Sequence, residues 1–259
     1  DDQAERDIQE CGVHGQHPST AGSGQDEPVI GRILLAAYAV VGVVNVVAET
    51  AGLSGAAHLT KPMLMPLLLA WLVVVMRPAG GLGAALRWLA AGVAFAWLGD
   101  LLLMGDGDAY FTGGIAAFLV TQVCYIVAFT RIPGPGLVRA WRIALVPYAV
   151  IWIVLNLLVS PGVGDMRVPV LLYSVVLISM SVAALDLVIR VPQRLGWRIA
   201  AGALLFVASD AVIALTAFGP LSSSPALTGL IMATYVAAQA LIVTGMAGSM
   251  LALRSAATR

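Results

Sequence analysis

Residues 92–104 read Gly-Val-Ala-Phe-Ala-Trp-Leu-Gly-Asp-Leu-Leu-Leu-Met, an apolar run interrupted by a single carboxylate, Asp100. Residues 202–214 repeat the pattern as Gly-Ala-Leu-Leu-Phe-Val-Ala-Ser-Asp-Ala-Val-Ile-Ala, with Asp210 in the same place. Both runs lie within segments that are long and apolar enough to span a membrane. A carboxylate inside such a helix is energetically costly and therefore indicates a functional site. Asp100 and Asp210 are thus the first candidates for functional residues.

The composition indicates a membrane protein. The chain has 259 residues, of which 60% are hydrophobic and 11% are charged, and its mean hydropathy is +0.93. A soluble domain has about 25% charged residues. The formal net charge is zero, so nothing points to a nucleic-acid partner. The two cysteines, Cys11 and Cys124, indicate neither a disulfide framework nor a metal-ligand cluster.

Eight segments are apolar over the ~20 residues that a ~30 Å bilayer core requires. They are residues 30–50, 59–77, 83–104, 110–131, 139–159, 167–190, 196–218 and 225–252. The connections are short and rich in Gly, Pro, Asp and Arg, which is typical of turns. We therefore expect one all-α transmembrane domain of eight helices over residues 29–259, preceded by a disordered polar tail over residues 1–28.

The basic residues are divided unequally between the two ends of the predicted helices. Of the 14 Lys and Arg residues, all except Lys61 and Arg167 fall on one side. The positive-inside rule then places both termini in the cytoplasm, and the expected location is a bacterial plasma membrane. Asp186 lies near the cytoplasmic end, four residues before Arg190, where an i,i+4 ion pair accounts for it.

The other polar residues of the predicted helices gather toward the non-cytoplasmic side. Together with the two aspartates they are Glu49, His58, Lys61, Gln122, Tyr173 and Gln239. At ~1.5 Å per residue they reach depths of up to ~21 Å from that face. We therefore expect them to line one cavity that opens to the non-cytoplasmic side.

Two halves of the chain resemble each other. The segments with Asp100 and Asp210 share the pattern described above. The segment after each of them has an aromatic residue four positions before a glutamine: Phe118 with Gln122, and Tyr235 with Gln239. A four-plus-four helix repeat would place the two aspartates at related positions, and superposition of the two halves tests this hypothesis.

Several short motifs follow one another between residues 58 and 245. They are Lys61-Pro62, Gly99-Asp100, Phe111-x-x-Gly-x-x-x-Phe118 with Tyr125, Tyr173 with Met180, Gly202-Ala-x-x-Phe-x-x-Ser-Asp210, and Tyr235-x-x-Ala-Gln239. In these motifs the sequence resembles the YhhN family of integral membrane proteins, which includes lysoplasmalogenases. It departs from the family pattern at Gln122, where the family has a histidine. If that histidine transfers protons in relatives, this chain lacks the group.

The resemblance implies hydrolysis of the vinyl ether bond of a lysoplasmalogen, with a fatty aldehyde and a glycerophospho-base as products. This reaction needs a carboxylic acid to protonate the β-carbon and a carboxylate to orient water and stabilise the cation. Asp100 and Asp210 can divide these roles, because burial and mutual repulsion make their protonation states differ. The sequence does not assign acid and base between them. No metal or cofactor is required.

The remaining candidates have supporting roles in this hypothesis. Lys61 is expected to bind the lipid phosphate, or alternatively to pair with Asp100 or Glu49. Residues that can position water or the glycerol hydroxyls are Tyr173, Gln122, Ser209 and Gln239. Each also has a purely structural interpretation. An aspartate or glutamine can join neighbouring helices by hydrogen bonds, and a lysine near the interface can extend its ammonium toward water.

Two other functions fit the same residues. Intramembrane carboxylates also mark proton relays, so a proton-coupled transporter is one alternative. A non-catalytic lipid-binding membrane protein is the other, and the glutamine at position 122 favours it. A serine hydrolase is disfavoured, because no serine occurs in a Gly-x-Ser-x-Gly motif.

Overall fold

The computed structural model describes residues 23–257, and this part of the chain is entirely helical apart from its turns. The longer helices are α1 (Ser23–Thr50), α2 (Ser54–Met76), α3 (Ala84–Leu102), α4 (Asp108–Thr130), α6 (Val146–Val159), α7 (Arg167–Asp186), α8 (Gln193–Ala217) and α9 (Pro225–Ala257). Short pieces are α5 (Leu137–Ala140), η1 (Arg142–Leu145), η2 (Gly164–Met166) and η3 (Leu187–Ile189). Eight spans of the described chain are long and apolar enough to cross a membrane. The predicted eight-helix membrane bundle is confirmed.

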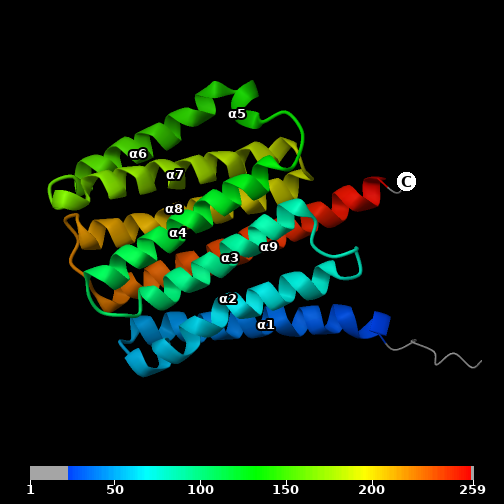
Figure 1. Cartoon of the computed structure of the whole chain (residues 1–259), viewed down its shortest axis with the longest axis horizontal. Helices are drawn as coiled ribbons and strands as arrows, with labels where there is room; N and C mark the ends of the chain where they lie inside the picture. Colours follow the sequence, from blue (N-terminus) through cyan, green and yellow to red (C-terminus); the bar gives the residue numbers. More distant parts are fainter. Residues whose placement is uncertain (1–22, 258–259) are drawn as a thin grey trace, which may run out of the picture.

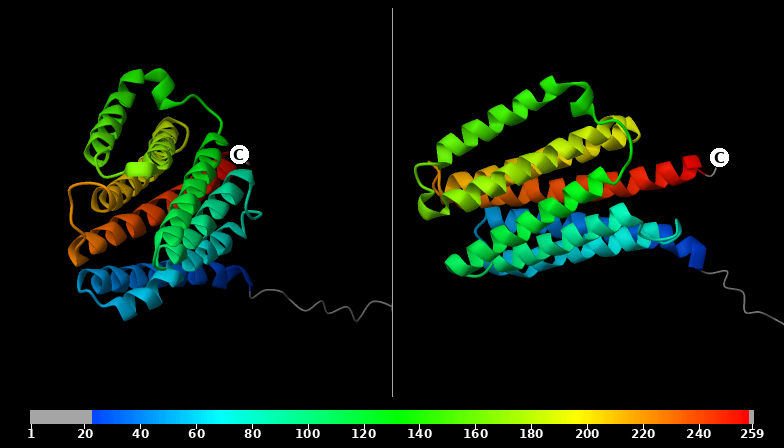
Figure 2. Two further views of the ribbon diagram at one scale, coloured as in Figure 1. Left: turned by 60° about the vertical axis from the view of Figure 1, so that its left-hand side comes forward. Right: turned by 45° about the horizontal axis from the view of Figure 1, so that its top comes forward.

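The helices run roughly antiparallel to one another, and the start of α1 and the end of α9 lie at the same end of the bundle (Figure 1). Helices α3, α4, α8 and α9 form the centre, α1 and α2 cover one side, and α6 and α7 cover the other (Figures 1 and 2). We call the end at which α1 begins the basic end, because its turns and helix ends hold most arginines. The opposite end, where Lys61 lies, is called the Lys61 end.

The start of the structure differs from the expected domain boundary. Helix α1 begins at Ser23, so residues 23–28 are helical although the sequence suggested an irregular tail. The rest of that predicted tail lies outside the described residues.

Helix α2 begins at Ser54, five residues before the predicted segment 59–77, and contains Pro62 and Pro66. Because Pro66 has no backbone N–H, the carbonyl of Pro62 loses its usual partner within the helix. The indole Nε1 of Trp97 on α3 donates to this carbonyl oxygen at 2.9 Å. The neighbouring helix thus satisfies a polar group that lipid cannot.

The predicted helix over residues 139–159 is divided in the structure. The short α5 ends at Ala140, and Trp141 has a non-helical backbone (φ −131, ψ 79) before η1 and α6. Helix α6 lies at the outer edge of the bundle (Figure 2). Of its side chains only Tyr148 and Val159 are buried, so most of its apolar surface faces outward.

Glycines allow the central helices to approach one another closely. A Cβ at Gly92 on α3 would lie 2.4 Å from Tyr125 Cε1 on α4. A Cβ at Gly202 on α8 would lie 2.9 Å from the carbonyl oxygen of Ala238 on α9. These close contacts, typical of membrane bundles, form two tight helix pairs, α3–α4 and α8–α9. Each pair contains one of the two intramembrane aspartates.

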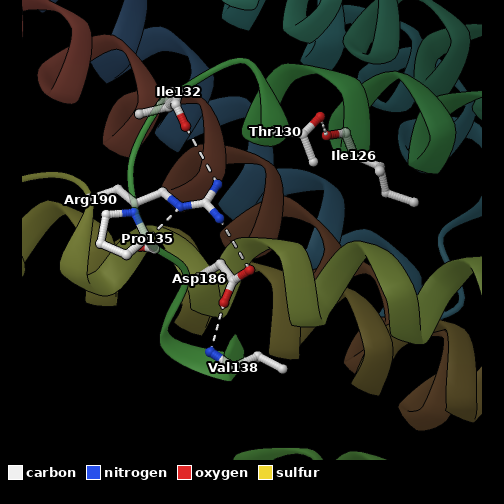
Figure 3. Close-up of polar contacts among 7 residues, drawn as sticks. All are labelled: Ile126, Thr130, Ile132, Pro135, Val138, Asp186 and Arg190. Carbon is white, nitrogen blue, oxygen red and sulfur yellow. Dashed lines mark hydrogen bonds and ion pairs between the residues drawn. The ribbon is translucent and has the colours of Figure 1, made fainter. Parts of the chain in front are cut away.

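Polar contacts close the basic end between α4 and α7 (Figure 3). Asp186 Oδ2 pairs with Arg190 at 3.3 Å, as the sequence predicted, and Asp186 Oδ1 accepts a hydrogen bond of 2.8 Å from the Val138 N–H. Arg190 also donates to the carbonyl oxygens of Pro135 and Ile132 at 3.3 and 3.4 Å. The connection between α4 and α5 is therefore held against the end of α7.

A second contact closes the same end on the other side of the bundle. Arg254, near the end of α9, donates hydrogen bonds to the carbonyl oxygens of Ala79 and Gly81. Both carbonyls belong to the turn between α2 and α3, so this turn is tied to α9.

Candidate active site

Asp210 on α8 is bound by side chains from two other helices. The Tyr173 hydroxyl on α7 donates to Asp210 Oδ2 at 2.5 Å, and Gln122 Nε2 on α4 donates to the same oxygen at 3.3 Å. The Asp210 side chain is 9% exposed. Both donors reach one oxygen, so the other carboxylate oxygen of Asp210 remains for a ligand.

Asp100 on α3 has a different set of neighbours. The Tyr235 hydroxyl on α9 donates to Asp100 Oδ2 at 2.8 Å. Lys61 on α2 lies close enough to act electrostatically on this carboxyl. Only 2% of Asp100 is exposed. This aspartate is therefore enclosed within the bundle, between α2, α3 and α9.

Each of the two aspartates accepts a hydrogen bond from a helix of the other pair. Asp100 belongs to the α3–α4 pair and is bound from α9, whereas Asp210 belongs to the α8–α9 pair and is bound from α4. An aromatic cluster joins the two sites. The ring centroids of Phe118, Phe206 and Tyr235 are 5.8 to 6.3 Å apart, in edge-to-face arrangements. Such contacts are favourable for aromatic rings and fix the relative position of the helices.

An apolar pocket lies beside Asp210 and is here called the Asp210 pocket. Only two of its lining residues, Asp210 and Tyr173, have polar side chains. The others are Leu103, Phe111, Ile115, Phe118, Val170, Ile213, Ala214 and Phe218. The pocket suits a hydrocarbon chain that meets one carboxyl group.

A polar pocket, the Lys61 pocket, lies at the same end of the bundle. Its empty volume is about 620 Å³. It is lined by Glu49, Ala57, His58, Lys61, Leu103, Met104, Gly105, Asp106 and Thr228. The His58 ring is held by the carbonyl oxygen of Ser54, at 2.7 Å from Nδ1. Charged groups of both signs are therefore available to a polar ligand.

The two pockets share one wall residue, Leu103. Leu103 directly follows α3 and comes three residues after Asp100, so Asp100 lies about one helical turn below the junction. The sequence predicted a single cavity lined by all polar candidates; the structure shows two adjoining pockets instead, and Asp100, Gln122 and Gln239 line neither of them. An apolar pocket reaches Asp210 and Tyr173, and a polar pocket reaches Lys61 and Glu49.

Two predicted positioning residues have partners that join helices. The Ser209 hydroxyl donates to the carbonyl oxygen of Ile231 on α9 at 3.0 Å. Gln239 Oε1 accepts a hydrogen bond of 2.5 Å from Tyr125 on α4. Neither residue lines the Asp210 pocket or the Lys61 pocket. In the structure both act as links between helices.

Tyr235 is the site residue that sequence reasoning did not select. It was noted in the repeat pattern and in a family motif but given no role, although it is the hydrogen-bond donor to Asp100. Two buried amide atoms, Gln122 Oε1 and Gln239 Nε2, have no hydrogen-bond partner among the described residues. Buried amide groups are usually hydrogen-bonded, so these two atoms are suited to bind internal water.

The fold and the site together define a polytopic helical membrane protein with two buried intramembrane carboxyl groups, one of which lines an apolar pocket. The chain belongs to the YhhN family, whose family model matches residues 56–246. This match confirms the resemblance seen in the sequence motifs. Searches of curated proteins and of solved structures found no match.

Proposed function

We propose that the chain is a membrane-embedded hydrolase that cleaves the vinyl ether bond of lysoplasmalogens. The observation that carries the proposal is the junction of an apolar pocket and a polar pocket at Leu103, with Asp210 in the wall of the apolar pocket and Asp100 about one helical turn from the junction. A lysoplasmalogen has one hydrocarbon chain and one polar head, joined through the vinyl ether and glycerol. The two pockets match these two parts of the molecule.

The head group fits the Lys61 pocket. The Lys61 ammonium and His58 can bind the phosphate, and Glu49 and Asp106 can bind a positively charged amine. The hydrocarbon chain then occupies the Asp210 pocket against Phe111 and Phe118. In this pose the vinyl ether lies near Leu103, between the two aspartates.

The reaction has three steps. A carboxylic acid transfers its proton to the β-carbon of the double bond, which leaves an oxocarbenium ion at the α-carbon. Water adds to the α-carbon, and a carboxylate accepts the proton that the water loses. The hemiacetal then collapses to a fatty aldehyde and the glycerol hydroxyl of the head-group product. Over one turnover the carboxylic acid loses one proton and the carboxylate gains one, so no proton is consumed overall.

The pose divides the roles of the aspartates. The β-carbon is on the chain side of the bond, so Asp210, which lines the apolar pocket, is the proton donor. The hydrogen bonds from Tyr173 and Gln122 stabilise the carboxylate that remains after proton transfer. The α-carbon is on the head-group side, where Asp100 and Lys61 lie and where the polar pocket supplies water. Asp100 is therefore assigned to water activation.

Gln122 replaces the histidine of the family pattern in this scheme. Its amide donates to Asp210, as a protonated histidine nitrogen would, but it cannot exchange a proton with solvent. We expect Asp210 to be reprotonated more slowly in this chain than with a histidine at this position, with the chemistry otherwise unchanged.

The placement of the Asp210 and Lys61 pockets at one end of the bundle fits an enzyme better than a proton-coupled carrier. A carrier exposes its site to the two sides of the membrane in turn. Here the contacts of Asp186, Arg190 and Arg254 hold the turns of the basic end against the helices, while the Asp210 and Lys61 pockets lie at the other end. In the proposal, the basic end faces the cytoplasm of a bacterial cell.

The test is turnover of matched lipids by the purified protein. A lysoplasmenyl-choline should yield fatty aldehyde and glycerophosphocholine in equal amounts. The 1-alkyl analogue has the same head and chain but no double bond, so it should bind and remain intact. Absence of aldehyde from the vinyl ether lipid, with correctly folded protein, would reject the proposal and favour a lipid-binding role.

A further inference from the structure

A third pocket lies between α6 and α7 at the Lys61 end and is here called the Arg167 pocket. Its empty volume is about 710 Å³. Its lining includes Trp152, Asn156, Ser160, Arg167, Val170 and Leu171. None of these residues was assigned a function above, although Val170 also lines the Asp210 pocket.

Polar side chains are concentrated on the facing sides of α6 and α7 beside this pocket. Trp152 Nε1 donates to Ser174 Oγ at 3.0 Å, and Asn156 Nδ2 donates to the same oxygen at 3.3 Å. Elsewhere α6 is almost entirely apolar, with exposed residues such as Val150 and Val154. These hydrogen bonds join α6 to α7, and Trp152 and Asn156 give the pocket a polar wall within an otherwise apolar surface.

Arg167 gives this pocket a positive charge. It is exposed, and within residues 23–257 no carboxylate is recorded in an ion pair with it. In the described chain, Lys61 and Arg167 are the only basic residues predicted at this end, and each lines a pocket. A guanidinium binds phosphate oxygens through paired hydrogen bonds, which makes phosphate the ligand that best matches it.

The surroundings identify the source of that phosphate. The pocket opens from the side of the bundle where α6 presents apolar residues, and Ile153, Leu157 and Leu171 line it together with the polar groups. A ligand that contacts both Arg167 and these apolar side chains needs a phosphate group and a hydrocarbon chain. A lipid of the surrounding bilayer has both parts and is present at high local concentration.

We propose that the Arg167 pocket is a second lipid site, in which Arg167 binds the phosphate of a membrane lipid and the hydrocarbon chain lies along α6 and α7. Because Val170 is shared, this chain lies at the wall of the Asp210 pocket. The site is then a lateral entrance through which a lysolipid passes from the bilayer to Asp210. The entrance role rests on the proposed function, whereas lipid binding does not.

Native mass spectrometry of the purified full chain in dodecyl maltoside, which contains no phosphate, tests the binding. The probe is a 1-alkyl lysophosphatidylcholine, which has no double bond to cleave. Wild type should retain two lipids, and Arg167→Gln should retain one. Arg142→Gln, which removes an exposed charge at the other end of the α6 segment, should still retain two. Arg167→Lys keeps the charge and shows whether loss of binding reflects loss of charge or misfolding.

The other outcomes also decide the question. One retained lipid that is lost in Arg167→Gln but kept in Lys61→Gln supports the second site and contradicts the head-group role of Lys61. Retention of the same number of lipids by Arg167→Gln as by wild type overturns the proposal. Displacement of the lipid by millimolar inorganic phosphate without a chain would mean a site for free anions and would also overturn it.

The entrance role has a kinetic test. Arg167→Gln should raise the KM for a lysoplasmenyl lipid about 10-fold and leave kcat unchanged, because a charge-assisted hydrogen bond to the entering head is lost. An unchanged KM would reject the entrance. If wild type releases no aldehyde, the proposed function fails, and the lipid count alone decides the second site.

Discussion

The Tyr173 hydroxyl on α7 donates a hydrogen bond of 2.5 Å to Asp210 Oδ2 on α8, and both residues line the same apolar pocket. A tyrosine in this position does two things. It fixes the carboxyl group at the wall of the pocket, and it stabilises negative charge on the oxygen that accepts the hydrogen bond. Both effects favour transfer of the proton that Asp210 is proposed to donate.

Tyr173→Phe removes this hydrogen bond and keeps the ring. We expect kcat for aldehyde release to fall about 10-fold or more, because a hydrogen bond to a charged group contributes about 1.5–3 kcal/mol. KM should change little, since the pocket keeps its shape. The control is Tyr110→Phe, at the start of α4 and outside both pockets, which should retain wild-type rates. Equal rates for Tyr173→Phe and wild type would remove Tyr173 from the mechanism.

Gln122 offers a test of the departure from the family pattern. Gln122→His should keep a hydrogen bond to Asp210 and add a group that exchanges protons, so kcat should equal or exceed that of wild type. Gln122→Leu should lower kcat about 10-fold, because Asp210 loses one of its two donors. A histidine variant slower than the leucine variant would contradict the proposed role of this position.

Lys61 should contribute to binding of the phosphate and little to binding of the chain. Lys61→Gln is expected to raise the KM for a lysoplasmenyl lipid about 10-fold, through loss of a charge-assisted hydrogen bond. The same substitution should leave the KM for an alkenylglycerol, which has no phosphate, nearly unchanged. If both substrates are affected equally, Lys61 acts on Asp100 or on folding, not on the head group.

Gly92 tests the packing that brings Asp100 into position. In Gly92→Val the new side chain collides with Tyr125, whose ring would lie 2.4 Å from the Cβ. Overpacking of this kind costs about 1–3 kcal/mol, so the thermal unfolding midpoint in detergent should fall. Gly55→Val is the matched control, because a Cβ there meets no atom within 4 Å. A similar midpoint for both variants would show that the α3–α4 contact can relax.

Much of the fold follows from local sequence. The eight spans could be predicted because each needs ~20 apolar residues, and Asp186 with Arg190 could be predicted because the pair is four residues apart on one helix. The α2 start and the break at Trp141 were missed, since membrane burial allows prolines and short breaks when neighbours satisfy the backbone. Trp97 is such a neighbour for the Pro62 carbonyl.

The site was less predictable, because its pairings are distant in sequence. Asp100 and Tyr235 are 135 positions apart, and Gln122 and Asp210 are 88 apart. Both aspartates could be selected because a carboxylate inside a membrane helix is energetically costly. That argument does not identify their hydrogen-bond partners. Ser209 adjoins Asp210 in sequence yet binds the Ile231 carbonyl, because successive helical residues point about 100° apart.

The exchange of partners between the two helix pairs bears on the proposed four-plus-four repeat. Asp100 is bound from α9 by Tyr235, and Asp210 is bound from α4 by Gln122. A repeat of four helices would relate α3 to α8 and α4 to α9, so each aspartate is bound from the related helix of the other pair. The two donors are not at equivalent positions, because the repeat relates Tyr235 to Phe118 and Gln122 to Gln239. Superposition of α3–α4 on α8–α9 should align the two aspartates. Misalignment by one helical turn would reject the repeat.

The central claim is that both aspartates act in vinyl ether hydrolysis. Its most direct test is release of fatty aldehyde from lysoplasmenyl-choline and lysoplasmenyl-ethanolamine by wild type, Asp100→Asn and Asp210→Asn. The asparagine variants keep the size of the side chain, and their thermal unfolding midpoints verify folding. The proposed function predicts aldehyde from wild type and a loss of at least about 100-fold in each folded variant. Substantial activity in either folded variant, or an inactive wild type, would contradict it.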